Sequence, residues 1–155
     1  MKMDVLCRAF ESLGFSGVST FIASGNVVFE TRAGNLRALE KKVERKLRET
    51  LAYNTAVFIR TDAELKEIAT FEPFGDVAGV NIIFLGDELD ERSREKVMAL
   101  ETTTDEFRVH GREIYWLRRK KPGTSLFSTV PFEKALCGPF TIRSANTVRK
   151  LAAYS

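Results

Sequence analysis

The chain has 155 residues and a mass of 17.5 kDa, enough for one substantial hydrophobic core or two small ones packed together. Hydrophobic residues make up 44% of the sequence and charged residues 29%, which excludes fibrous and intrinsically disordered proteins. Its apolar runs are of strand length, and charged residues interrupt the first turns, where a leader peptide would be apolar. We therefore expect a cytoplasmic protein without membrane contact. The net charge of +3 permits an anionic partner without requiring one.

The chain opens with a predicted helix followed by a hairpin. Apolar residues recur at helical spacing over residues 3–13, and Gly14 follows where a helix commonly ends. Residues 18–22 and 27–30 are β-branched and aromatic, which predicts two strands. The segment between the two strands holds a Gly-Asn pair that is common in hairpin turns.

A second helix is predicted over residues 36–51, where an apolar stripe of period about 3.6 is the clearest helical signal in the chain. Asn35 precedes the stripe as a plausible N-cap. Glu40 and Glu44 fall among the charged residues of this segment and are expected to face solvent. Residues 56–60 then predict the strand that closes the first half.

The remaining chain begins with a capping box, Thr61 with Glu64, and a short helix. Breaker residues at 72–76 predict a domain boundary. The apolar run 80–85 is typical of a central strand. Further predicted elements are a helix at 90–100, strands at 107–109 and 113–117, a helix from Pro131, a strand at 140–142 and a helix at 146–153.

The order helix, strand, strand, helix, strand therefore occurs twice, and only the second copy has an opening strand. This order predicts an α+β fold of two ferredoxin-like (βαββαβ) halves, residues 1–76 and 77–155, packed as one compact unit. Since an opening strand would lie in the middle of its sheet, we expect Ala56–Arg60 to pair directly with the hairpin, or another segment or chain to fill the position. A homo-oligomer formed through the incomplete first sheet follows from the second alternative.

Several strings resemble one bacterial family, the domain of unknown function 1697. Gly111-Arg112-Glu113-Ile114-Tyr115 is one of them, and the two most specific in combination are Ser24-Gly25-Asn26-Val27-Val28-Phe29 and the pair Thr141 and Arg143. The resemblance implies the duplicated ferredoxin-like fold and no assigned activity. The chain departs from the family in two places. It starts after the usual opening strand and its glycine-bearing segment, and it has Ser144-Ala145 where the family usually has an asparagine and often an aromatic residue.

The turn Ser24-Gly25-Asn26 is the first candidate site, for an anion, because glycine lets backbone N–H groups approach a ligand closely. The alternative is a plain hairpin turn.

Thr141, Arg143, Asn146 and Thr147 form a second candidate site, since a helix N-terminus favours negative charge and Arg143 can grip a phosphate or carboxylate. The alternative is helix capping by Ser144 or Asn146.

The basic run that starts with Arg118 and Arg119 follows a strand containing Tyr115 and Trp116. Cations beside aromatic rings suit single-stranded nucleic acid, because bases stack on rings while phosphates meet the charges. The alternative is a solvated strand end with Trp116 in the core.

Catalytic and metal-binding patterns are weak. His110 is the sole histidine and lies in a predicted turn, and Cys7 and Cys137 are far apart in the sequence, so we expect no metal site and no cofactor. The carboxylates at 87, 88, 90 and 91 are typical of helix capping. The leading hypothesis is a module that binds an anionic ligand, a nucleotide or nucleic acid. An enzyme of unassigned reaction and a homo-oligomeric interaction protein are the alternatives.

Overall fold

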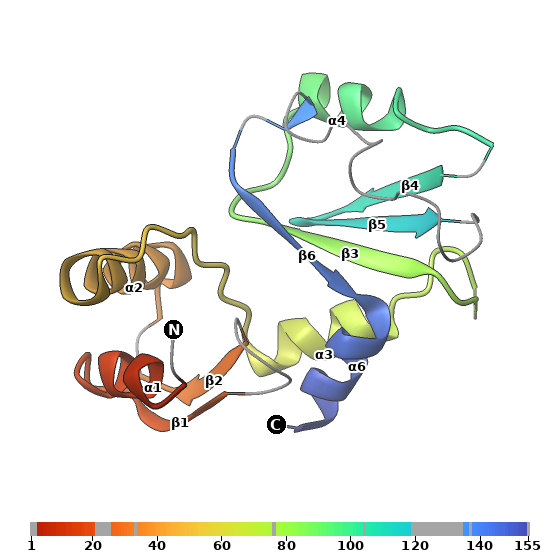
Figure 1. The fold of residues 1–155 in the computed structure, drawn as a ribbon. Coiled ribbons are helices and arrows are strands. Elements are labelled where there is room, and N and C mark those ends of the chain that lie inside the picture. The colour runs from red at the N-terminus through yellow and green to blue at the C-terminus, as the bar shows by residue number, and fades with distance from the viewer. Residues whose placement is uncertain are drawn as a thin grey trace. The chain divides into compact units, whose positions relative to one another are not determined.

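Figure 1 shows the computed structural model, which describes residues 3–20, 26–32, 34–75, 77–103, 105–118, 135–136 and 138–154. The fold is α+β, with helices and two antiparallel sheets. Two compact units can be distinguished, residues 1–62 with 153–155, and residues 63–152. Within the described ranges, no helix has both the length and the apolar character needed to span a bilayer.

The first unit contains helix α1 (Met3–Glu11), strands β1 (Ser16–Thr20) and β2 (Val27–Glu30) and helix α2 (Leu36–Leu51). The chain turns after α1 at Gly14, whose φ of 90° explains the glycine. The two strands pair antiparallel, as predicted. Their core consists of Leu6, Ala9, Phe10, Phe15, Leu39, Val43, Leu47 and Ile59.

Helix α2 begins where the sequence predicts, because the Asn35 side chain accepts a hydrogen bond from the amide of Ala38. It ends at Ala52, which adopts the left-handed conformation at φ 53° and donates its N–H to the Leu47 carbonyl. The expectation that Glu40 faces solvent is wrong: its side chain is fully buried.

The prediction of a strand at Ala56–Arg60 is also wrong. Residues 52–61 contain no strand, although they run alongside α2. The amide of Ile59 donates to Glu40 Oε2 at 2.6 Å, and the amide of Val57 donates to Glu44 Oε2 at 2.7 Å. The amides of Val57 and Ile59, which a neighbouring strand would otherwise bind, are therefore bonded to two carboxylates of α2. Residues 56–60 do not pair with the hairpin.

The second unit is built on a four-stranded antiparallel sheet with the strand order β4-β5-β3-β6. The strands are β3 (Val80–Leu85), β4 (Asp105–His110), β5 (Glu113–Arg118) and β6 (Phe140–Ser144). The apolar run of β3 lies between β5 and β6, as expected for a central strand. The helices are α3 (Asp62–Thr70), α4 (Glu91–Met98) and α6 (Ala145–Tyr154); most of the helix predicted from Pro131 lies outside the described residues.

One face of this sheet forms the core of the second unit together with α4. Phe107, Ile114 and Trp116 are fully buried there and meet Val97 of α4. Asp90 caps α4 by accepting from the amide of Ser93 at 2.7 Å, as predicted for these carboxylates.

The opposite face carries the alternate residues of the strands and meets α3 and the chain that follows it. The Tyr115 hydroxyl donates to the Ile68 carbonyl at 3.1 Å, and Arg112 bonds the Glu64 carboxylate at 2.8 Å. Figure 1 shows α3 and α6 on the side of the sheet away from α4. This second face holds the residues discussed below.

Candidate functional site

Arg143 and Thr141 lie on β6, an edge strand, and point to the face of the sheet opposite α4. The Arg143 Nη1 donates to the Thr141 hydroxyl at 2.8 Å and to the Ile142 carbonyl at 2.9 Å. Partial burial lowers the pKa of Arg143. A half-buried guanidinium is thus held in a defined position by two uncharged oxygens.

The junction of β6 and α6 has no connecting loop, because β6 ends at Ser144 and α6 starts at Ala145. Ser144 Oγ accepts from the amide of Thr147 at 3.1 Å and lies 2.9 Å from the Thr147 hydroxyl, so Ser144 is the N-cap. Asn146 is exposed on the first turn. The structure therefore brings Thr141, Arg143, Asn146 and Thr147 into one short stretch, with the cap supplied by Ser144.

The other predicted site residues are placed differently. Arg118 is 7% exposed, its Nε lies 3.4 Å from Asp105 Oδ1, and its guanidinium lies over the Trp116 ring at 5.4 Å. Trp116 is buried in the core and donates its indole N–H to the same Asp105 oxygen at 2.9 Å. The charge of Arg118 is therefore matched inside the second unit. Arg119, Ser24 and Gly25 lie outside the described residues; Asn26 is described and is half-buried.

The register of the sheet aligns one residue from each of the four strands on the face opposite α4. Arg108, Tyr115, Ile82 and Arg143 are consecutive cross-strand partners and form one row. Partners directly opposite one another share a face, so the two arginines occupy the two edges of the same surface. Three strand spacings of about 4.8 Å separate them, or about 14 Å.

An aromatic cluster on this face was not predicted from the sequence. The Phe71 ring stacks on the His110 imidazole, with ring centroids 4.3 Å apart and planes inclined by 21°. Phe71 also meets Tyr115 edge-on at 5.0 Å, and the Arg108 guanidinium lies 5.2 Å from the Phe74 ring centre. Phe71 and Phe74 follow α3 in an irregular segment, so no periodic pattern in the sequence identified their partners.

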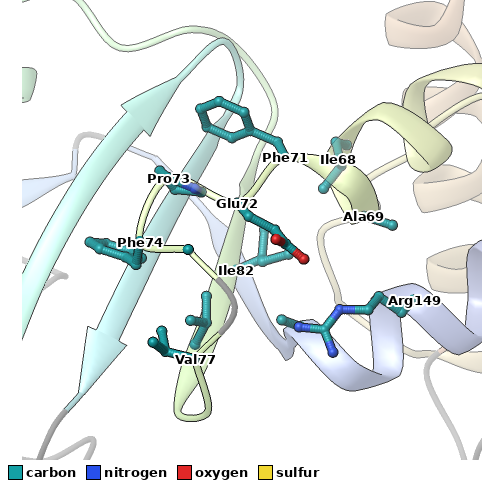
Figure 2. A pocket seen from close by; sticks show the side chains of 12 residues that line it. Ile68, Ala69, Phe71, Glu72, Pro73, Phe74, Val77, Ile82 and Arg149 are labelled. Carbon is teal, nitrogen blue, oxygen red and sulfur yellow. The ribbon is translucent and has the colours of Figure 1, made fainter.

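A cavity of about 20 Å³ lies between this irregular segment, β3 and α6. Figure 2 shows its lining, with Ile82 at the base and the side chains of Glu72 and Arg149 directed over it. The volume accommodates about one water molecule and is far below the ~300 Å³ of small-molecule sites. A buried substrate therefore does not fit in this cavity.

A larger concavity in the first unit, about 530 Å³, is open and polar. Gly14, Ser16, Glu30, Thr31 and Arg32 line it. Its two charged residues, Glu30 and Arg32, are exposed to solvent, and no aromatic or apolar residue lines the concavity. Sites that bind small molecules usually have such a lining, so this concavity does not resemble one.

Groups suited to catalysis are not gathered within the described ranges. His110 stacks on an aromatic ring, and Cys7 is a free, half-buried thiol of the other unit. No three His, Cys, Asp or Glu side chains of these residues lie close enough to hold a metal ion. Tyr115 has a strongly raised pKa, chiefly because its side chain is buried and to a smaller extent because of the nearby Glu113 carboxylate. Its hydroxyl donates to the Ile68 carbonyl. That perturbation has a structural cause.

Comparison with known proteins places the chain in a family and supports the fold. No curated protein matches the sequence. Among solved structures, the chain is similar to the conserved bacterial protein SP0830 from Streptococcus pneumoniae, with 21% identity and a TM-score of 0.74 over 99% of this chain and 88% of that one. The family model described as protein of unknown function (DUF1697) matches residues 1–115. The chain therefore belongs to the DUF1697 family, as its sequence strings indicated.

Proposed function

We propose that this protein is a binding module for an anionic ligand of the nucleotide or nucleic-acid class. The observation that carries the proposal is the Arg143 guanidinium, half-buried at the edge of the second sheet and oriented by Thr141 and Ile142. A cation that has lost part of its hydration gains more from an anion than a fully hydrated one does. Its planar donors match a phosphate in a fork geometry.

The neighbouring polar groups add to this argument. Asn146 and Thr147 stand in the first turn of α6, where backbone N–H groups and the helix dipole favour negative charge. The small volume of the cavity beside β3 favours a ligand that lies on the surface over a substrate enclosed by the protein. Surface binding through phosphates requires no catalytic group.

Titration of short fluorescein-labelled single-stranded RNA and DNA with the protein, followed by fluorescence anisotropy at several salt concentrations, tests the proposal. We expect saturable binding that weakens with salt, because each phosphate contact contributes a slope of about 0.7 for a single strand. Arg143→Gln is expected to weaken binding about tenfold, the effect of one charge-assisted hydrogen bond, and to reduce the slope by one contact.

Arg94→Gln is the matched control, since Arg94 is exposed on α4, which covers the other face of the sheet. Arg143→Lys separates charge from geometry: it keeps the salt slope but loses the fork. Absence of binding by the parent protein at low salt, to both oligonucleotides and to nucleoside triphosphates, would contradict the proposal.

We further infer that the second unit is ferredoxin-like and that the two units derive from one duplicated plan. In chain order, the sheet of the second unit runs fourth, first, third, second strand, and every neighbour is antiparallel, as in the split βαβ arrangement. The first unit has the succession helix, hairpin, helix, and in the second unit a hairpin likewise follows a helix, α4. A structure of the complete family fold with a second such sheet around β1 and β2 would support the duplication.

A second candidate function is self-association through β2. Within the part of the chain that the structure describes, β2 pairs with β1 alone, and residues 52–61 are bonded to α2 instead. Val27, Val28 and Phe29 form a half-buried apolar edge without proline or lysine, the type of edge that pairs with another chain. Light scattering after size-exclusion chromatography tests it: a concentration-dependent dimer lost in Val28→Pro supports the idea, and a monomer at all concentrations rejects it.

A further inference from the structure

We propose that His110, stacked on Phe71, is a platform for one base of a single-stranded nucleic acid. This inference rests on the proposed function and names its ligand more narrowly. His110 is exposed at the end of the edge strand β4, and one face of its ring is covered by Phe71 at 4.3 Å. A histidine ring fixed in this way offers a flat surface to a base, and imidazole is among the rings on which unpaired bases stack.

Phe71 and Tyr115 support the His110 ring on the side that faces the protein. Phe71 meets Tyr115 edge-on at 5.0 Å, and Tyr115 is 1% exposed with its hydroxyl bonded to the Ile68 carbonyl. The three rings thus form a series that begins in the core and ends at the surface. Because Tyr115 is buried and Phe71, although 38% exposed, already packs against it, a base that stacks on His110 orders few additional side chains on binding.

Cations lie where the phosphates of such a strand would run. Arg108 is two residues before His110 on β4, so both side chains lie on the same face of the sheet. Its guanidinium packs over Phe74, bonds the Phe107 carbonyl at 2.8 Å and lies 3.3 Å from Glu101 Oε1, which also accepts from the Phe107 amide. An exposed ion pair of this kind contributes little and yields readily to a phosphate.

The spacing on this face favours a strand over a mononucleotide. Arg108 and Arg143 lie in one row about 14 Å apart, and His110 and Thr141 lie in the next row. One nucleotide in contact with His110 does not reach Arg143. Tyr115 and Ile82, which lie between the two arginines, are each 1% exposed, so contact with both arginines requires a short strand that runs over the segment covering them. A duplex does not fit the platform, because its bases are already stacked on one another.

The test compares labelled oligouridylate with an abasic oligomer of the same length, both titrated by anisotropy at fixed salt. We expect the parent protein to bind oligouridylate more tightly, since stacking adds to the phosphate contacts. His110→Ala is expected to weaken oligouridylate binding about tenfold and to leave abasic binding unchanged. His110→Phe keeps a ring and is expected to restore most of the affinity. Circular dichroism melts verify that each variant is folded.

The outcomes separate this inference from the proposed function. Equal binding of both oligomers, unchanged by His110→Ala, overturns the platform and leaves phosphate binding in place. If neither oligomer binds, the platform is overturned, and the proposed function is overturned with it if nucleoside triphosphates also fail to bind. A loss of affinity in His110→Ala that is equal for the two oligomers also overturns the platform, because it shows no dependence on the base.

Discussion

Substitution of Glu40 tests the most buried polar contact of the first unit. The carboxylate is fully buried, accepts from the Ile59 amide at 2.6 Å and bonds Arg37 Nη1 at 2.7 Å. We expect Glu40→Ala to reduce the free energy of unfolding by about 2–5 kcal/mol. The bond between the Ile59 amide and a charged acceptor accounts for most of it, about 1.5–3 kcal/mol. The lost methylene adds about 0.8 kcal/mol. The Arg37 side chain is 42% exposed, so its bond adds at most about 1 kcal/mol.

Glu40→Gln retains the shape and one acceptor oxygen, and is expected to cost about 1–2 kcal/mol. Urea denaturation measures both variants, and hydrogen exchange at the Ile59 amide reports the contact directly. Glu49→Ala is the matched control, because Glu49 is exposed on the same helix and should change stability by no more than about 0.5 kcal/mol. If Glu40→Ala changes stability as little as the control, or if the Ile59 amide keeps its protection, the reasoning is refuted.

Three further predictions concern the second unit. Gly79→Ala places a Cβ 2.7 Å from the Arg118 carbonyl oxygen at φ 87°, and we expect a loss of about 1–3 kcal/mol by urea denaturation. Tyr115→Phe removes the hydroxyl that donates to the Ile68 carbonyl and should lower the free energy of unfolding by about 0.5–1.5 kcal/mol. Burial raises the pKa of Tyr115, so this contribution is present below about pH 10 and is lost progressively above it. Unfolding curves of both proteins at several pH values measure the difference. The hydrogen bond from a first-turn amide lowers the pKa of Asp90, so its contribution holds above about pH 4 and falls with acidification; Asp90→Ala should flatten the acid limb of the stability profile, and an unchanged limb contradicts the assignment.

Elements with a strong local signal were predictable from the sequence. The apolar stripe of α2 and its cap Asn35, the continuous apolar run of β3, and the turn at Gly111 between β4 and β5 are all found as expected. Each depends on neighbours within a few residues. The strand β6 and the helix α6 that carry Thr141 to Thr147 were predictable for the same reason; their role as a site stays a prediction.

The features that the sequence did not predict depend on contacts between residues far apart in the chain. Glu40 belongs to the charged positions of α2 by sequence, and only the tertiary fold turns it toward the amide of Ile59. That bond in turn removes residues 56–60 from strand pairing. The stack of His110 on Phe71 likewise joins the end of β4 to an irregular segment and has no periodic signature. Local pattern reasoning cannot find such contacts, because nothing in one segment specifies its partner.

The direct passage from β6 into α6 has a consequence for the alignment of the edge strand. Edge strands with a single neighbour slip easily, and a shift of one residue turns every side chain to the opposite face. Here Ser144 is both the last residue of β6 and the cap of α6, so such a slip would also pull the hydroxyl away from the Thr147 amide. The start of α6 thus stabilises the register of β6. Two sets of hydrogen bonds fix the face to which Arg143 points: the pairing of β6 with β3, and the cap at Ser144.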